Sequence, residues 1–480
     1  MIDFLKKNYY KIILICIFVS AIVLRIYSFA TYRPLWRDEC SLAINIYYKS
    51  FTGLWGVLFH AQSAPPLFMS ICKIFNQIIP YIPEYMLRLF PLLSGLVSIW
   101  LFYLLTEKFF RTKFAIILSN ILFAINTQLI YFSHEFKQYS TDVAICIGAV
   151  LYFSNLNLEK FSRKQIIYNS ILFVLLPFLS LPSVFILGAW GLIQILNKVK
   201  IKSLISIFLP SVILNFIYYV FTLLPARKLM LYYLEFMWDD GFIKPNLYSI
   251  YAVIKNNLLF CFQPCNIYHI PALYIAIGFI ISIKRRCETD KLILYTILMV
   301  ILASVLSIYP IKNRVSLYLL PFIIIYIILP IDYFAQKLSK FIFTIILCIF
   351  LFGYSHYNLE NTYYEDANQM MQILKNNYKI GDYIFYNDVS DSQYIIYSHL
   401  YDFKVPDNRL GVFQLTDYGE DWYYSILNTL PKNNKYWFFY SYDLDSKPVI
   451  PFLKNWAHKN GKILFEKEIN NKSYLLYLQL

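Results

Sequence analysis

The stretch YRPLWRDECSLAIN, residues 32–45, follows a predominantly apolar run, 12–30, that is long enough to cross a bilayer as a helix. It sets Arg37, Asp38 and Glu39 side by side at the point where that helix ends. Charged groups at the end of a membrane span are costly unless they are paired or take part in function. The stretch therefore predicts a membrane protein with a functional site where its first helix emerges.

The composition agrees with a membrane protein. The 480-residue chain is 59% hydrophobic and only 15% charged, whereas soluble domains carry about 25% charged residues. Aromatic residues make up 19% of the chain, which is typical of proteins with long membrane–water interfaces. The net charge is +14, but most Lys and Arg lie in short clusters between apolar runs, so membrane topology explains the charge better than nucleic-acid binding does.

These basic clusters set the topology, because Lys and Arg collect in cytoplasmic loops. Lys6, Lys7 and Lys11 precede the first run, which places the N-terminus in the cytoplasm and the loop 31–84 on the outer face. Within that loop, 64–80 begins with two prolines and is half polar, so we expect a helix lying along the outer surface. About eleven membrane spans are expected, with ends uncertain by a few residues: 12–30, 85–106, 114–132, 141–157, 166–180, 182–197, 204–223, 268–283, 291–309, 315–331 and 341–357.

The last part of the chain differs from the rest. Residues 358–480 contain no spanning run and alternate strand-like pieces, such as YIFYN and KYWFFYSY, with helical ones, such as EDANQMMQILKNN. This alternation predicts a small α/β domain, which the span count places outside the cytoplasm. The expected organisation is thus a mainly α membrane domain, 1–357, and a soluble extracytoplasmic domain, 358–480. Among the eight cysteines no metal-binding spacing occurs, and the close pair Cys261 and Cys265 would allow, without requiring, a disulfide.

The predicted topology gathers ionisable and polar residues from separate segments at the outer face. They are Arg33, Arg37, Asp38 and Glu39 in the first loop, Glu84 and Arg88 at the start of the second span, His134, Glu135, Lys137, Tyr139 and Asp142 at the exit of the third, and Lys312 and Arg314 in a late turn. Acids and bases gathered at one mouth of a membrane protein indicate a functional site.

The chemistry available at an outer membrane face narrows the function. ATP and nucleotide-activated sugars are absent there, so a sugar donor must come through the bilayer on a polyprenyl phosphate. Displacement at the anomeric carbon needs an ionised carboxylate to take the acceptor's proton, and an Asp with an ordinary pKa of about 4 is ionised at neutral pH. Cations must stabilise the leaving phosphate. Asp38 fits the first role, and Lys137 and Arg314 fit the second.

Four pieces in this order, LWRDEC, SAPPLFMSI, MLRLFPLLSGL and YFSHEFKQYSTD, resemble the GT-C-fold glycosyltransferases. More narrowly, the chain is similar to the superfamily of protein O-mannosyltransferases and lipid A aminoarabinose transferases. The similarity covers about 1–330 and is strongest over 30–145. It implies a GT-C fold, a polyprenyl-phosphate-linked sugar donor, inversion at the sugar, and Asp38 as the base.

The resemblance also extends to other positions. It implies that Pro65 and Pro66 line the donor site, and it matches Asp142 and Arg314 to family positions. Two departures stand out: Ser63-Ala64 replaces a basic or His residue before the prolines, and Lys137 stands where the family often carries Arg. Lys replaces the charge but not the fork of Arg. We assign as catalytic candidates Asp38, Glu39 and Asp142, as donor-phosphate ligands Lys137, Arg314, Arg88 and Tyr139, and as further site residues Glu135, Arg37, Pro65 and Pro66.

Less specific interpretations stay open for several of these residues. Asp38 and Glu39 could be the solvated start of a helix, Glu84 and Arg88 could pair with each other four residues apart, and Lys137 could reach the headgroups. Glu135 could be a charge at the rim of the site, and His134 could be structural. Asp239 and Asp240 could form a surface turn or contact the acceptor.

A metal is not assigned, although Asp38, Glu39 and Asp142 are candidate ligands for a divalent cation. A transporter or flippase for lipid-linked sugars and an O-antigen-type ligase are the alternative functions. The charges lie at helix exits on one face and no internal repeat is visible, which favours an enzyme. The sequence leaves the sugar and the acceptor (glycan, lipid or protein) open. Its richness in Ile, Lys, Asn and Tyr favours a bacterial inner membrane.

Overall fold

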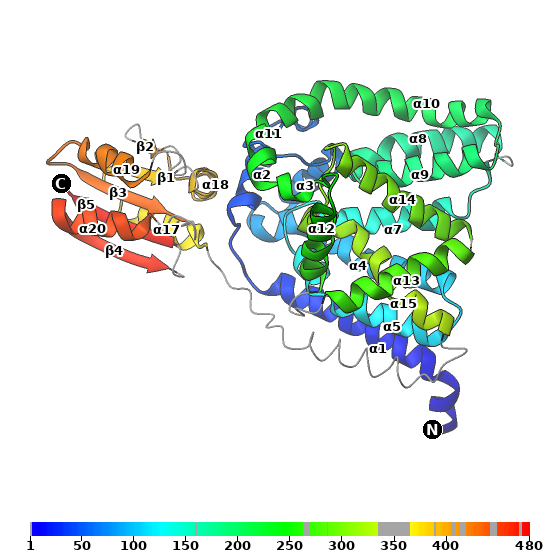
Figure 1. Ribbon diagram of the computed structural model, residues 1–480. Helices are drawn as coiled ribbons and strands as arrows, with labels where there is room; N and C mark the ends of the chain where they lie inside the picture. Colours follow the sequence, from blue (N-terminus) through cyan, green and yellow to red (C-terminus); the bar gives the residue numbers. More distant parts are fainter. Residues whose placement is uncertain are drawn as a thin grey trace. The chain divides into compact units, whose positions relative to one another are not determined.

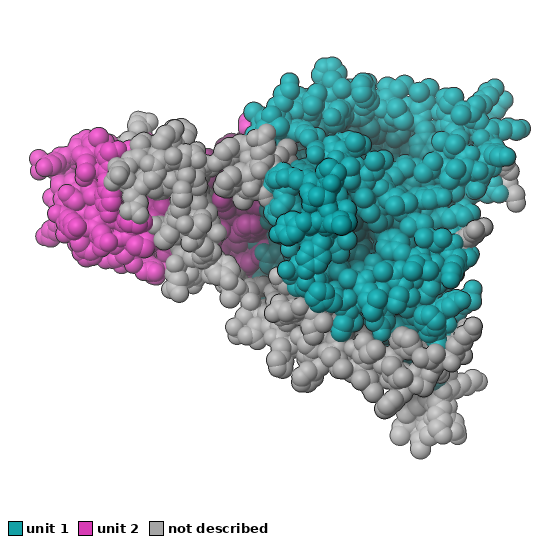
Figure 2. Space-filling model, in the orientation of Figure 1, with its two compact units in different colours: residues 1–31, 51–57, 63–359 teal, residues 32–50, 58–62, 360–480 magenta. Residues whose placement is uncertain are grey.

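The computed structural model is mainly helical and carries one small β-sheet (Figure 1). It describes residues 2–158, 161–262, 268–285, 287–334, 365–387, 390–404, 409–412, 419–441, 449–469 and 473–480. The chain divides into two compact units, coloured separately in Figure 2. Unit 1 comprises 1–31, 51–57 and 63–359, and unit 2 comprises 32–50, 58–62 and 360–480. Residues 32–50 and 58–62 of the first loop thus fall in unit 2, together with the C-terminal part of the chain. The predicted boundary at 357/358 lies outside the described residues and stays a prediction.

Unit 1 is a bundle of helices. Its elements are α1 (Ile2–Ala30), η1 (Gly53–Trp55), α3 (Pro66–Ile78), α4 (Pro83–Phe109), α5 (Lys113–Ile125), α6 (Thr127–Phe132), α7 (Tyr139–Phe153), α8 (Arg163–Leu179), α9 (Ser183–Leu196), α10 (Ile201–Tyr218), η3 (Tyr219–Leu223), α11 (Leu224–Met237), η4 (Asp239–Gly241), α12 (Leu247–Cys261), α13 (His269–Arg285), α14 (Glu288–Val305), η5 (Asn313–Leu319) and α15 (Leu320–Phe334).

Four helices in the described part of the chain are long and apolar enough to cross a membrane: Asn8–Ala30, Pro83–Phe109, Ile201–Leu231 and Asn313–Phe334. Each overlaps a predicted span. Three further predicted spans correspond to shorter apolar helices, α5, α7 and α9. The predicted last span, 341–357, lies outside the described residues, as does Cys265, with which Cys261 could form a disulfide. The total of eleven spans stays a prediction.

Local capping explains where several helices of unit 1 begin. The Thr112 hydroxyl accepts the Ala115 N–H at the start of α5, and the Asn126 side chain accepts the Leu129 N–H at the start of α6. Ser162 and Gln165 form a reciprocal capping box at the start of α8. Helix α3 starts with Pro66 at a first-turn position, where the missing N–H is not needed. With 13 residues, α3 is shorter than a membrane span, as expected from its sequence.

The close packing of α4 against α7 places the segment that follows α6. A Cβ on Gly95 would come within 2.7 Å of the Ser133 Cβ, so only glycine permits this approach. Ser94 and Thr141 share a hydroxyl hydrogen bond of 2.9 Å, and Ser140 donates to the carbonyl of Pro91 at 3.0 Å. These contacts fix the first turn of α7, which carries Tyr139 and Asp142, against α4.

Unit 2 is an α/β unit built on a five-stranded sheet. Its elements are α2 (Arg37–Tyr48), α17 (Ala367–Asn377), β1 (Tyr383–Asn387), α18 (Asp391–Leu400), β2 (Arg409–Val412), α19 (Gly419–Asn428), β3 (Lys435–Tyr440), α20 (Ile450–Asn460), β4 (Lys462–Ile469) and β5 (Ser473–Gln479). The strand order is β2-β1-β3-β5-β4. Strand β1 pairs in parallel with β2 and β3, whereas β5 runs antiparallel to β3 and β4.

The core of the sheet explains why the sequence predicted these strands. Strand β3 has five consecutive buried residues and β5 has six, so both read as continuous apolar runs. Strand β4 lies at the edge and alternates exposed with half-buried residues. The aromatic rings of Trp437 and Tyr477 stack across β3 and β5 with centroids 4.3 Å apart. The predicted α/β character of this part of the chain agrees with the described sheet.

Candidate functional site

Helix α2 presents Asp38 in its first turn. The helix begins at Arg37, and Asp38 and Glu39 are the acidic residues of the turn. Asp38 is half-buried, whereas most of α2 beyond it is buried. An anion in the first turn interacts favourably with the helix dipole. The fold of unit 2 therefore supports an ionised carboxylate that keeps access to solvent at position 38.

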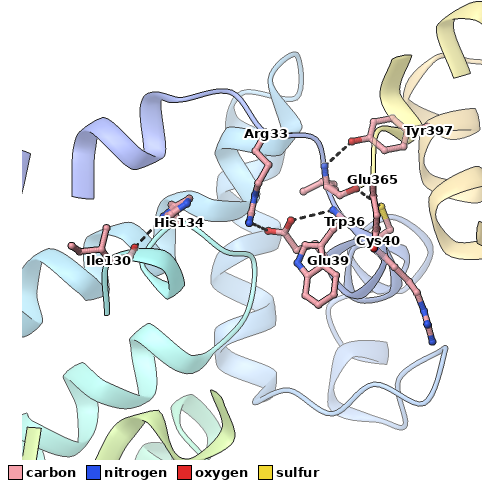
Figure 3. Close-up of polar contacts among 10 residues, drawn as sticks. Arg33, Trp36, Glu39, Cys40, Ile130, His134, Glu365 and Tyr397 are labelled. Atoms are coloured by element: carbon pink, nitrogen blue, oxygen red, sulfur yellow. Dashed lines mark hydrogen bonds and ion pairs between the residues drawn. The ribbon is translucent and has the colours of Figure 1, made fainter. Parts of the chain in front are cut away.

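The neighbouring carboxylate, Glu39, is fully buried and bonded to the loop that carries it (Figure 3). Its Oε1 lies 3.5 Å from Nη2 of Arg33, which is also buried. Its Oε2 accepts the backbone N–H of Trp36 at 3.3 Å. Both carboxylate oxygens thus have partners within residues 33–39. This geometry supports a structural role for Glu39 as the cap of α2, which was the alternative to a catalytic one.

Three side chains from the C-terminal part of unit 2 hold the backbone on either side of Trp36, and two of them, Glu365 and Tyr397, are drawn in Figure 3. The phenol oxygen of Tyr397 accepts the Leu35 N–H at 2.7 Å, and Oε2 of Glu365 accepts the Arg37 N–H at 2.7 Å. The Ser392 hydroxyl donates to the Arg37 carbonyl at 3.2 Å. The segment that leads into α2 is therefore anchored from both sides.

Glu365 is a buried carboxyl next to the start of α2. Its pKa is raised to about 7, mainly by burial and also by the nearby Asp38 carboxylate. Hydrogen bonds from the Arg37 N–H and from Gln393 and the charge of Arg37 act in the opposite direction. Gln393 Nε2 donates to the same oxygen, Oε2, at 2.8 Å. Sequence reasoning missed Glu365, Tyr397 and Ser392 as neighbours of the first loop.

The second group of predicted site residues lies in unit 1, around the turn between α6 and α7. Glu135, Lys137, Tyr139 and Asp142 are all buried. The Ser180 hydroxyl, from the connection between α8 and α9, donates to Oδ1 of Asp142 at 2.7 Å. A charged group buried beside a helix start in a membrane protein is costly, so the burial of this group is consistent with a functional site.

Arg314 and the proline pair lie close to this turn. The guanidinium carbon of Arg314, in η5, lies 5.9 Å from the centre of the Tyr139 ring. The side-chain amide of Gln138 donates to the Ser63 carbonyl at 3.4 Å, and the rings of Phe68 and Phe136 stack with centroids 6.2 Å apart. The structure therefore brings the segment with Pro65 and Pro66 against the turn that carries Lys137.

Other predicted residues are either buried in unit 1 or paired with a neighbouring charge. Arg88 is buried in the first turns of α4, and His134 is buried with Nδ1 donating to the Ile130 carbonyl at 3.0 Å (Figure 3). Lys312 pairs with Asp240, and Lys244 pairs with Asp239. These contacts support the structural interpretation of His134 and the surface-turn interpretation of Asp239 and Asp240.

Asp38, Glu39 and Arg37 belong to unit 2, whereas Asp142, Lys137, Tyr139, Arg314, Arg88, Glu135, Pro65 and Pro66 belong to unit 1. The structure thus assembles two partial sites, and their meeting at one active centre stays a prediction. Within the described part of the chain, no cluster of three or more His, Cys, Asp or Glu side chains could hold a metal ion. Glu39 in particular already uses both oxygens, so it is a poor donor for a cation.

No family model matches the chain, and no curated protein matches it in sequence. Solved structures do. ArnT from Cupriavidus metallidurans bound to undecaprenyl phosphate aligns over 98% of this chain and 98% of its own, with a TM-score of 0.57 and 10% identity. The apo state of ArnT aligns over 96% and 97%, with a TM-score of 0.56 and 11% identity.

The chain has the fold of ArnT. ArnT is a lipid A aminoarabinose transferase with the GT-C fold, so the predicted resemblance is confirmed at the level of the fold. The sequence motifs indicated a resemblance over about 1–330, whereas the structural likeness to ArnT covers nearly the whole chain. A weaker likeness, with a TM-score of 0.48 and 15% identity, links 83% of the chain to 62% of the oligosaccharyltransferase of Archaeoglobus fulgidus. Together with its apolar helices, the ArnT fold makes this chain an integral membrane protein.

Proposed function

We propose that this chain is an inverting membrane glycosyltransferase that moves a sugar from a polyprenyl-phosphate carrier to an acceptor hydroxyl. The observation that carries the proposal is the likeness over almost the full length of both chains to ArnT, which was crystallised with undecaprenyl phosphate. The half-buried Asp38 in the first turn of α2 and the cations of unit 1, of which Lys137 and Arg88 are buried, supply the chemical groups that the reaction needs.

In the proposed reaction, the Asp38 carboxylate takes the proton from the acceptor hydroxyl as its oxygen attacks the anomeric carbon. The new carbon–oxygen bond forms on the face opposite the phosphate, and the bond from the anomeric carbon to the phosphate oxygen breaks. The electron pair leaves with the polyprenyl phosphate, so the sugar is inverted. The proton then passes from Asp38 to solvent, which its partial exposure allows.

The cations of unit 1 bind the departing phosphate in this proposal. Lys137 supplies a point charge, and Arg314 supplies a planar fork that matches two phosphate oxygens. Arg88, which is buried at the start of α4, adds a third positive charge, and the Tyr139 ring lies beside the half-buried Arg314. Preorganised cations of this kind stabilise charge that develops in the transition state. We place Asp142 and Glu135 beside them as residues that orient the cations, and Arg37 beside Asp38.

We place this site, together with unit 2, on the extracytoplasmic side of a bacterial inner membrane. The proposal rests on the clusters of Lys and Arg in the loops that the topology assigns to the cytoplasm. The donor is a hexose or pentose on a polyprenyl phosphate, and the acceptor is a surface glycan, a lipid or a protein. A divalent metal is not part of the proposed steps.

The proposal is tested in a strain that lacks the gene. Mass spectrometry of lipids and surface glycans should show one sugar addition missing and the lipid-linked sugar accumulating. The wild-type chain should restore the addition, and Asp38→Asn, at equal membrane level, should not. Restoration by Asp38→Asn would overturn the role of Asp38. Accumulation of the lipid-linked sugar on the cytoplasmic side alone would favour a flippase instead.

A further inference from the structure

The hydrogen bonds that anchor α2 come from side chains more than 300 positions away in the sequence. Arg37 and Glu365 are separated by 328 residues, Leu35 and Tyr397 by 362, and Arg37 and Ser392 by 355. All five of these residues belong to unit 2. Helix α2 also packs along α18, where the ring of His399 lies 4.7 Å from that of Tyr47 and 5.5 Å from that of Tyr48, centre to centre. The part of the first loop that carries α2 is therefore built into the α/β unit.

The anchor continues into the interior of unit 2 as a chain of buried polar groups. Glu365 accepts from Gln393, the Ser441 hydroxyl bonds to the Gln393 side-chain oxygen, and the Ser473 hydroxyl donates to the Ser441 carbonyl at 2.7 Å. Ser441 directly follows β3, and its N–H donates to the Ser390 hydroxyl at 2.9 Å. All five residues are buried. A fully bonded buried network of this kind rigidifies the groups at its end.

The network begins at a particular edge of the sheet. Ser390 follows β1 and Ser441 follows β3, two parallel strands that are neighbours in the order β2-β1-β3. The carboxyl ends of parallel strands at such a reversal of strand order are where open α/β sheets commonly place a ligand. In this chain the polar groups after these two strands lead instead through Gln393 and Glu365 to the start of α2.

We propose that Glu365, supported by Tyr397, is a positioning residue that holds the start of α2 and thereby aims Asp38 at the acceptor. The inference rests on the proposed function of Asp38. It assigns unit 2 a direct part in the reaction: the α/β unit fixes the base, and the helical unit carries the cations. Loss of the Glu365 contact lets the first turn of α2 open, so Asp38 keeps its chemistry but loses its orientation.

This arrangement has a kinetic signature, because orientation of a reacting group affects the rate of the chemical step more than substrate affinity. The groups that face Glu365 are Arg37 and Asp38 from α2 and the neutral Gln393 from α18. The pKa of Glu365 is raised to about 7. When the carboxyl ionises, its bond to the Arg37 N–H becomes charge-assisted and stronger, and its charge makes Asp38 a stronger base. Both effects raise kcat as pH increases through about 7.

The test uses the full chain in detergent or nanodiscs with a polyprenyl-phosphate-linked sugar and an acceptor extract. Glu365→Ala should lower kcat about 10- to 100-fold with little change in KM for the donor. Glu365→Gln keeps an acceptor for the Arg37 N–H, so it should recover most of kcat but lose the rise near pH 7. Asp366→Asn is the matched control: Asp366 is the neighbouring carboxylate, caps α17, and makes no described contact with α2. It should leave kcat and the pH profile unchanged.

Hydrogen exchange supplies a readout that does not depend on turnover. The Leu35 and Arg37 amides should be protected in the wild-type chain and in Glu365→Gln. Glu365→Ala should expose the Arg37 amide, and Tyr397→Phe, which removes only the hydroxyl, should expose the Leu35 amide. Unchanged protection, or a Glu365→Ala enzyme with wild-type kcat, overturns the positioning role while Asp38→Asn stays inactive. An active Asp38→Asn enzyme overturns the proposed function instead, so the two failures are distinguishable.

Discussion

The first turn of α2 and the turn before α7 both bury charge, but they hold it in different ways. At α2, the carboxylates of Glu39 and Glu365 accept backbone N–H groups and an arginine, within an α/β unit. Around the start of α7, the Asp142 carboxylate accepts a hydrogen bond from the Ser180 hydroxyl, and Arg314 from η5 lies over the Tyr139 ring, within a helical bundle. We infer that the two regions have different roles: hydrogen bonds orient the base of the proposed reaction, and helix packing places the cations.

The largest effect on stability is expected when the Glu39 carboxylate is removed, which tests whether hydrogen bonds hold the first turn of α2. Glu39→Ala leaves the buried Arg33 without its carboxylate, and we expect a loss of about 3–5 kcal/mol in the free energy of unfolding. Glu39→Gln keeps an oxygen for the Trp36 N–H and should lose less. Thermal unfolding, followed alongside transfer activity, checks the expectation. If Glu39→Gln folds normally but has no activity, Glu39 is catalytic and the two carboxylates of the turn work together.

A smaller effect is expected when a cation is removed from unit 1. Lys137→Ala should lower kcat/KM for the donor about 10- to 100-fold, because one stabilising charge on the phosphate is lost. Lys137→Arg restores the charge and should recover at least half of the activity. The exposed Lys244, paired with Asp239, provides the control Lys244→Ala, which should change nothing. A Lys137→Ala enzyme with unchanged donor kinetics would remove Lys137 from the phosphate site.

The smallest effect concerns the pH dependence of stability. The pKa of Glu365 is raised from 4.5 to about 7, so the folded chain holds this proton more tightly than the unfolded chain does. Its contribution to stability is fully present below pH 4.5 and is lost as pH rises through 7. The loss is at most about 3 kcal/mol. Unfolding midpoints should therefore fall with rising pH more steeply in the wild-type chain than in Glu365→Gln, and equal slopes would contradict this assignment.

Much of this architecture is visible in the sequence because it depends on local pattern. Strand β1 coincides with the predicted YIFYN, and the apolar runs of α1 and α4 predict their spans. A helix start at Asp38, one of the interpretations left open, follows from the preference of acidic residues for helix N-termini. These features depend on periodicity, on charge clusters and on capping residues, all of which lie within one turn or one strand.

The supporting contacts are not visible, because they join distant parts of the chain. Glu365 stands in YYEDAN without any periodic pattern around it, and its partner lies 328 residues earlier. Ser180 reaches Asp142 across 38 residues, in a connection that looks like an ordinary turn. That residues 32–50 of the first loop belong to unit 2 was not visible for the same reason. A charged triplet after a span shows that a site exists, but not which domain supports it.

The most direct test of the central claim is a single turnover of the purified chain with a labelled polyprenyl-phosphate-linked sugar. In Asp38→Asn, donor binding should stay within about twofold of wild type, while release of polyprenyl phosphate and transfer of the sugar fall about 10²- to 10⁴-fold. Release at the wild-type rate in Asp38→Asn would contradict the account, because another group would then be taking the acceptor's proton.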